Sequence, residues 1–152
     1  MIDQRLQELG ITLPPVFAPA GSYLGCVVDN GVVYVAGHGP INGDNVIRGK
    51  LGRDLSVEEG RHAARMTALS ILATLRADLG DLDRIARIVK VFGMVNVAPG
   101  FNQTPAVIDG CSDLLVDVFG DAGRHARSAV GLAELPFDIA VEIELIARLR
   151  EP

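Results

Sequence analysis

The chain has 152 residues, 49% of them hydrophobic, and can therefore bury a single core without disulfides or metal ions. Nineteen acidic residues against fourteen basic ones give a net charge of −5, which disfavours non-specific binding to nucleic acid or to an anionic membrane. No apolar run approaches the roughly 18 residues of a membrane-spanning helix, and the first residues do not begin a signal peptide. We therefore expect a cytoplasmic protein with neither a membrane nor a nucleic-acid partner.

The N-terminal part predicts a short helix followed by a hairpin. Apolar residues at helical spacing in residues 1–9 end at Gly10, and a proline-containing connector follows. We interpret residues 1–15 as an extension of one domain that spans residues 1–152. Two β-prone runs, residues 24–28 and 32–36, flank Asn30-Gly31, which accepts the positive φ angles of a type I′ turn.

Two longer helices and three further strands follow. A loop with a short strand near Val46 follows the hairpin. Ser56 and Glu59 then form a capping box that begins a helix, and this helix ends at Gly80. Thr104-Pro105 begins a second helix. The remaining strands are expected at residues 86–97, 126–133 and 139–149. The order β-β-α-β-α-β-β predicts an α+β fold, in which a mixed sheet carries two helices on one face.

The strand at residues 86–97 is apolar on both sides, which suggests that both faces of the sheet are covered. Val89, Val91 and Val95 alternate with three residues that we place on the other side, namely Ile88, Phe92 and Met94. Because two helices cover one face, we expect a second subunit on the other.

The two cysteines point to no special chemistry. Cys26 and Cys111 lie far apart and outside any C-x-x-C pair, so a zinc or redox site is not favoured. We expect both to be reduced core residues and predict no metal site.

Arg127 and Glu142 are charged residues within the two apolar C-terminal strands. Such residues either face water or have a partner. They could form a polar site at the sheet. The alternative is an exposed cross-strand ion pair, which contributes less than about 1 kcal/mol.

The sequence around these two residues resembles a known family. Residues 127–136 read RSAVGLAELP and residues 141–144 read VEIE, a combination similar to the C-terminal signature of the RidA/YjgF family, also labelled L-PSP endoribonuclease. The turn AGHGP at residues 36–40 resembles the family's Ser-Gly-Gln-hydrophobic-Pro turn. The resemblance extends from about Pro19 to Leu149 and suggests a divergent member.

The resemblance implies a chorismate-mutase-like fold and a homotrimer with ligand clefts between subunits. It also implies cofactor-independent hydrolysis of reactive 2-imino or enamino acids to 2-keto acids and ammonia. Arg127 matches the residue that binds the substrate carboxylate, and Glu142 matches the one that orients the attacking water; we take both as candidate catalytic residues. Tyr23 and Asn96 match further cleft residues, although Tyr23 could equally be ordinary hairpin packing.

Several positions depart from the family pattern. Ala36 replaces a serine, Ala129 replaces a cysteine, and Gly131 replaces a longer side chain, so the resemblance implies a wider and less polar cleft. Gly37 belongs to the same cleft turn, and Ala36, Gly37 and Ala129 are counted as substrate-binding positions.

The three histidines receive different interpretations. His38, in the cleft turn, and His125, two residues before Arg127, are candidates to border the cleft, and imidazole suits proton transfer near neutral pH. His62 is expected on a solvated helix face.

Three functions remain open. The first is an enzyme that hydrolyses imino acids, with Arg127 as anchor and Glu142 as water-positioning group. The second is a non-catalytic module that binds small carboxylates, which the alanines at 36 and 129 favour. The third is the ribonuclease of the family label, against which stand the net negative charge and the absence of basic runs interleaved with aromatic residues.

Overall fold

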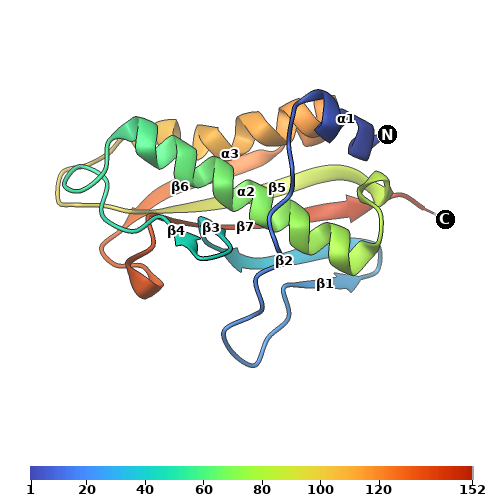
Figure 1. The fold of residues 1–152 in the computed structure, drawn as a ribbon, viewed down its shortest axis with the longest axis horizontal. Helices are drawn as coiled ribbons and strands as arrows, with labels where there is room; N and C mark the ends of the chain where they lie inside the picture. Colours follow the sequence, from blue (N-terminus) through green and yellow to red (C-terminus); the bar gives the residue numbers. More distant parts are fainter. Residues whose placement is uncertain (152) are drawn as a thin grey trace.

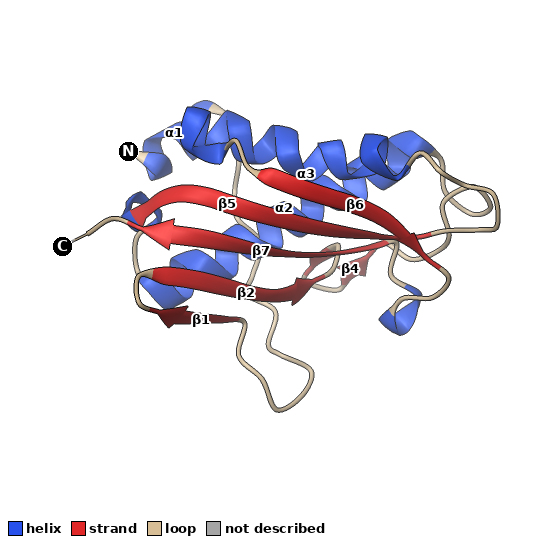
Figure 2. Cartoon of the chain, turned by 180° about the vertical axis from the view of Figure 1, so that it is seen from behind, coloured by secondary structure: helices blue, strands red, loops and turns tan. Residues whose placement is uncertain are grey.

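The computed structural model describes residues 1–151, which form one layer of sheet and one layer of helices (Figure 1). In chain order the helices and strands are α1 Ile2–Glu8, β1 Cys26–Asp29, β2 Val32–His38, β3 Ile41–Asn42, β4 Asn45–Val46, α2 Val57–Leu79, β5 Ile85–Asn96, α3 Thr104–Phe119, β6 Ala126–Leu132 and β7 Val141–Leu149. Short 3₁₀ turns lie at Leu82–Arg84, Gly120–Gly123 and Pro136–Asp138. Both long helices lie on the same face of the sheet (Figure 2), so the predicted α+β fold is confirmed.

The local signals in the sequence produce the expected elements. Asn30 and Gly31 have φ angles of 50° and 74°, as the type I′ turn between β1 and β2 requires. At the start of α2 the Ser56 hydroxyl accepts the Glu59 amide hydrogen, and the Glu59 carboxylate accepts the Ser56 amide hydrogen. Gly80 ends that helix with a φ of 81°.

The strand order of the main sheet is β1-β2-β7-β5-β6. β5 runs parallel to β6, which it reaches through α3, and antiparallel to β7. The two C-terminal strands are therefore not neighbours, because β5 lies between them. This order excludes the cross-strand ion pair between Arg127 and Glu142 that the sequence suggested.

The core lies between the sheet and the two long helices. Strand residues such as Val91, Val95 and Ile143 are fully buried there against α2 and α3. The interpretation of Ile88 was wrong: it is fully buried on this face, whereas Val89 is 42% exposed. The cause is an irregularity in the pairing with β7 between Ile88 and Lys90, which reverses the alternation.

The face of the sheet opposite the helices carries half-exposed apolar side chains. Tyr34 is 48% exposed and Val130 is 39% exposed, while Phe92 and Met94 are partly buried. The second subunit that we expect on this face stays a prediction. Among the described residues, no helix combines the length and the apolar character needed to cross a bilayer.

The N-terminal extension packs on the helical layer. Leu6 of α1 is 2% exposed, and the N-terminal ammonium group donates to Asp83 at 3.0 Å. The segment between α1 and β1 then runs across α2 and loops out from the body of the molecule (Figure 1). This segment forms one wall of the cavity described below.

Candidate functional site

A cavity of about 350 Å³ lies where the segment before β1 meets the end of β2, the start of β7 and the turn before β7. Most of its lining is apolar; the polar exceptions are Tyr23, His38, Ser70 and Glu142. The remaining lining residues are Phe17, Pro19, Ala20, Gly25, Ala36, Gly37, Gly39, Ile41, Pro136, Phe137 and Ile139. None of these residues is lysine or arginine, so a carboxylate ligand would meet no cation within one chain.

Glu142 supplies the negative charge of the cavity. Along β7 it alternates with Ile143, which is buried against the helices. The side chain of Glu142 therefore lies on the opposite face of the sheet. Gly37 leaves room for it: a Cβ at Gly37 would lie 2.4 Å from the Glu142 Oε2 atom. Burial, and secondarily the neighbouring charge of Glu144, raises the pKa of Glu142. A carboxylate in this setting is a stronger base than one in water.

His38 is buried in the cavity wall and uses both ring nitrogens within the chain. Its Nδ1 lies 2.6 Å from the Ala36 carbonyl oxygen and its Nε2 lies 2.8 Å from the Thr74 hydroxyl oxygen. Because a carbonyl only accepts, the network assigns the proton to Nδ1, and Nε2 accepts from Thr74. Burial lowers the pKa of His38, which favours this neutral form. The ring is therefore a neutral wall of the cavity.

Tyr23 and Ala36 also line the cavity. Tyr23 is 51% exposed, and its hydroxyl accepts the Ala20 amide hydrogen at 3.3 Å. This bond fixes the ring on the segment before β1. Ala36 contributes a methyl group where a serine would contribute a hydroxyl.

Arg127 lies on the other side of the sheet. It is in register with buried Val91, and its guanidinium contacts α3. Nη1 donates to Asp109 Oδ1 at 2.8 Å and to Ser112 Oγ at 3.1 Å, and Nη2 contacts the Pro105 carbonyl oxygen at 3.5 Å. Among the residues described, Nε has no acceptor. The Nε–Nη2 edge of the guanidinium is therefore the part that can bind a ligand carboxylate.

Two other candidates, His125 and Ala129, lie with Arg127. The His125 Nδ1 lies 2.6 Å from the Gly123 carbonyl oxygen, and its Nε2 lies 2.9 Å from the Ser112 hydroxyl oxygen. Burial is the main cause that lowers the pKa of His125, and the charge of Arg127 lowers it further. The Ala129 carbonyl oxygen accepts from Thr104 at 3.0 Å.

The sequence-predicted residues thus form two separate groups within one chain. Gly131 also belongs to the Arg127 side: an added Cβ would lie 2.9 Å from the Val97 side chain, so the glycine permits close packing there and does not widen the cavity.

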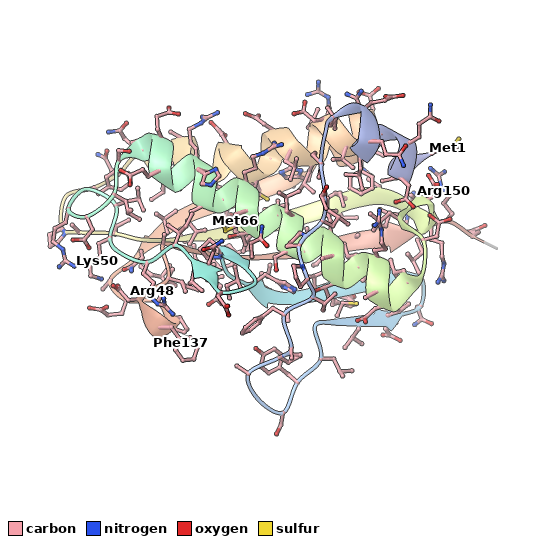
Figure 3. All side chains as sticks on the ribbon, viewed as in Figure 1. Met1, Arg48, Lys50, Met66, Phe137 and Arg150 are labelled. Atoms are coloured by element: carbon pink, nitrogen blue, oxygen red, sulfur yellow. The ribbon has the colours of Figure 1, made fainter. Side chains whose placement is uncertain are left out.

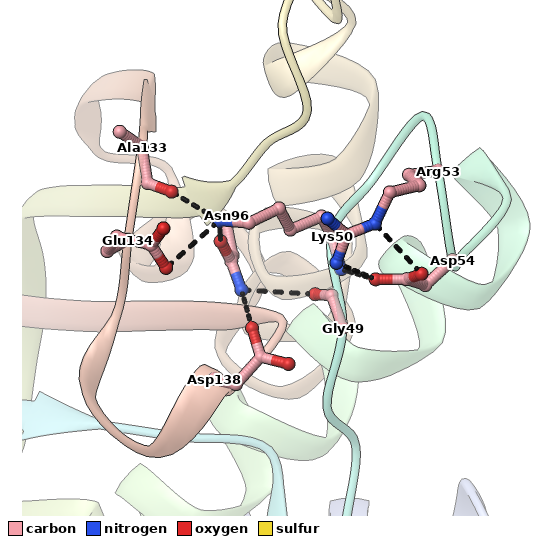
Figure 4. Close-up of polar contacts among 8 residues, drawn as sticks. All are labelled: Gly49, Lys50, Arg53, Asp54, Asn96, Ala133, Glu134 and Asp138. Carbon is pink, nitrogen blue, oxygen red and sulfur yellow. Dashed lines mark hydrogen bonds and ion pairs between the residues drawn. The ribbon is translucent and has the colours of Figure 1, made fainter.

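Asn96 belongs to neither group. It is fully buried, and its amide donates to the Gly49 carbonyl oxygen and to Asp138 Oδ1, while its oxygen accepts from Lys50 Nζ at 2.8 Å (Figure 4). It does not line the cavity. The geometry makes it a support for the turn that precedes β7.

Sequence reasoning missed several cavity residues. Phe17 and Phe137 are aromatic residues in segments expected to be connectors, and Ile41 and Ile139 follow turns. An exposed aromatic residue in a connector is a weak signal, because surface apolar residues are common.

His62 is exposed, as expected. Within residues 1–151, no three His, Cys, Asp or Glu side chains gather closely enough to hold a metal ion.

The chain is similar to proteins of one family over nearly its whole length. The sequence model described as "YjgF/chorismate mutase-like, putative endoribonuclease" matches residues 3–149. Protein TCP17 of Trypanosoma cruzi is 45% identical over 150 residues, which cover 97% of this chain and 94% of that protein.

Two solved structures have the same fold. The protein Atu1372 of Agrobacterium tumefaciens, described as of unknown function, superposes with a TM-score of 0.91 at 40% identity, over 98% of this chain and 92% of that one. A "putative endoribonuclease" of Shewanella oneidensis superposes with a TM-score of 0.94 at 33% identity, over 98% and 99% of the two chains. The chain therefore belongs to the RidA/YjgF family, with its chorismate-mutase-like fold.

Proposed function

We propose that this protein hydrolyses 2-imino or enamino acids to 2-keto acids and ammonia, in clefts between the subunits of a cytoplasmic homotrimer. The observation that carries the proposal is the position of Glu142: a carboxylate of raised pKa in a mostly apolar cavity that contains no cation of its own chain. A substrate carboxylate beside Glu142 would be repelled unless a cation came from elsewhere. Arg127 of a neighbouring subunit would supply it through the edge that carries Nε, which has no acceptor among the described residues.

Each residue then has a defined task. The Arg127 Nε–Nη2 edge binds the substrate carboxylate with two parallel hydrogen bonds. Glu142 accepts a proton from a water molecule, whose oxygen adds to C2 of the imine to form a carbinolamine. That proton passes from Glu142 to the former imine nitrogen, which completes the neutral carbinolamine. As the C–N bond breaks, Glu142 takes the carbinolamine hydroxyl proton and delivers it to the leaving nitrogen, so that ammonia departs and C2 becomes the keto carbon. Neither a cofactor nor a metal is needed for this sequence.

The first test uses 2-iminobutanoate, generated from threonine by a dehydratase. We expect the wild type to accelerate loss of the imine. Arg127→Ala should raise KM about 10- to 100-fold, because it removes charge-assisted hydrogen bonds. Arg124→Ala is the matched control, since Arg124 is an exposed arginine near the same strand. No acceleration by the wild type would contradict the enzyme proposal for this substrate.

Glu142→Gln should lower kcat about 10²- to 10⁴-fold, because an amide cannot accept the proton. Glu144→Gln is its control on the same strand. It should retain kcat and shift the acid limb of the pH profile to lower pH, because it removes a charge that raises the pKa of Glu142.

A carboxylate-binding module without catalysis is the second candidate. Two observations favour it: Ala36 offers no hydroxyl, and both nitrogens of His38 are occupied within the chain. This candidate predicts that 2-oxobutanoate binds in an Arg127-dependent manner while the imine is not hydrolysed. The ribonuclease of the family label is less favoured, because the net charge of −5 and the carboxylate in the cavity both repel phosphates. An RNA-cleavage assay on the same preparation tests it.

A further inference from the structure

The turn between β6 and β7 holds an aromatic residue in an unfavourable backbone conformation. Phe137 has φ 57° and ψ 19°, and Asp138 has φ 58°, so two consecutive residues with side chains adopt the left-handed region. Residues other than glycine, asparagine and aspartate rarely adopt it. Such strain persists only where surrounding contacts impose it, and it is commonly found at ligand-binding sites.

Polar contacts from a distant segment impose this conformation. The Arg48 Nε donates to the Phe137 carbonyl oxygen at 3.1 Å, and the Gly49 amide donates to the Asp138 carbonyl oxygen at 2.9 Å. The Asn96 amide donates to the Asp138 carboxylate at 2.8 Å. Arg48, Lys50 and Phe137 lie at the same end of the molecule (Figure 3).

Lys50 anchors the start of the same turn. Its side chain is 11% exposed, and its ammonium group contacts the Asn96 side-chain oxygen, the Ala133 carbonyl oxygen and the Glu134 carboxylate (Figure 4). Lys50 and Asn96 together therefore fix both ends of the turn, from Ala133 to Asp138.

These contacts place the aromatic ring of Phe137 at the cavity wall. Phe137 is 74% exposed, and it is not part of the core cluster of the chain. It lines the cavity together with Phe17, which is 49% exposed, and Tyr23. A partly buried lysine and a buried asparagine thus hold a strained turn whose aromatic side chain has little contact with its own chain.

From this geometry we infer that Phe137 is a specificity-determining residue, and that the cavity prefers 2-imino and 2-oxo acids with an apolar, ring-sized side chain over those with a methyl group. The inference rests on the proposed function for the position of the carboxylate. The ligand's ring packs on Phe137 and Phe17, and offset or edge-to-face ring contacts favour it further. Lys50, Asn96 and Arg48 are positioning residues that act through the turn.

The test measures the binding of two product-type probes, 2-oxo-3-phenylpropanoate and 2-oxopropanoate, by calorimetry on the full chain. We expect the wild type to bind the phenyl compound about 10-fold or more tightly than the methyl compound, because apolar area is buried. Phe137→Asn should reduce that ratio about 10-fold, because the phenyl compound loses its ring contact. Asparagine tolerates the left-handed region, so this variant keeps the turn. Phe137→Tyr, which keeps the ring, should restore the preference.

Two further variants test whether the preference for the phenyl compound depends on the position of the turn or changes with any substitution of the chain. Asn96→Ala releases the turn and should reduce the preference for the phenyl compound, while Val89→Ala, on an exposed apolar residue outside the cavity, should not. Equal binding of both probes by the wild type, or an unchanged ratio in Phe137→Asn, would overturn the inference and leave the proposed function standing. Failure of both probes to bind the wild type would instead count against the carboxylate site itself.

Discussion

Gly37→Ala offers a direct perturbation of the candidate site. The added Cβ would lie 2.4 Å from Glu142 Oε2, and an ordinary contact begins at about 3.4 Å, so the carboxylate oxygen has to move by about 1 Å. A displacement of about 1 Å of a catalytic group can cost about 10²-fold in rate. We therefore expect kcat for 2-iminobutanoate to fall about 100-fold.

The same substitution should leave the fold intact. Gly37 has no positive φ, and the atoms nearest to the new Cβ belong to the flexible end of Glu142. Alanine also restricts the unfolded chain, which stabilises by about 0.4–1 kcal/mol where the conformation is compatible. Urea denaturation should therefore show an unchanged or slightly raised free energy of unfolding.

The assay combines kinetics with a carbon-13 NMR titration of the Glu142 carboxyl group. The Gly37→Ala variant should lower the pKa of Glu142, because the carboxyl group leaves the buried position that raises it. Adding Glu142→Asp, which shortens the side chain, should recover part of the lost rate in the Gly37→Ala background. Unchanged kcat together with an unchanged Glu142 titration would refute the reasoning, because the carboxylate would then not lie against Gly37.

Three further predictions concern the rest of the chain. Gly110→Ala should destabilise the protein by at least about 2 kcal/mol in urea denaturation, because its Cβ would lie 2.0 Å from the Arg61 carbonyl oxygen, a backbone atom that cannot yield. Burial raises the pKa of both Cys26 and Cys111 to about 12, so neither thiol should react with Ellman's reagent at pH 8 until the protein is denatured; a fast native reaction would contradict their burial. Burial lowers the pKa of His38, so the folded state binds its proton less readily than the unfolded state. The stability that this difference contributes is fully present above the unfolded pKa of about 6.5 and should be lost as pH falls from there through the lower folded pKa; His38→Gln should weaken this dependence in thermal unfolding.

The fold was largely predictable because its signals are local. The Asn30-Gly31 turn, the Ser56 capping box and the helix end at Gly80 each depend on residues within a few positions of one another, and all three are confirmed. The register of β5 was harder. The pairing irregularity near Ile88 depends on contacts with β7, more than fifty residues away in sequence, and alternation alone cannot locate it.

The site was predictable only in part, for a similar reason. Tyr23, Gly37 and Glu142 line one cavity of the chain, and their role in binding a ligand stays a prediction. The order of the strands was not encoded in any short segment, and it separates Arg127 from Glu142. The role of Asn96 was also hidden, because its partner Lys50 lies in a loop and its other partner, Asp138, in a strained turn.

The central claim is that Arg127 and Glu142 act together across a subunit interface, although they lie apart within one chain. Subunit complementation tests it most directly. Homo-oligomers of Arg127→Ala and of Glu142→Gln are mixed, dissociated and reassembled, and activity is measured at a substrate concentration far below the raised KM of Arg127→Ala, where each variant alone should be only weakly active. In a randomly mixed trimer, about one quarter of the clefts combine an intact Arg127 with an intact Glu142 from its neighbour, so about one quarter of the wild-type activity on 2-iminobutanoate should return. No recovery of activity in reassembled mixed trimers, or a monomer by light scattering, would contradict the claim.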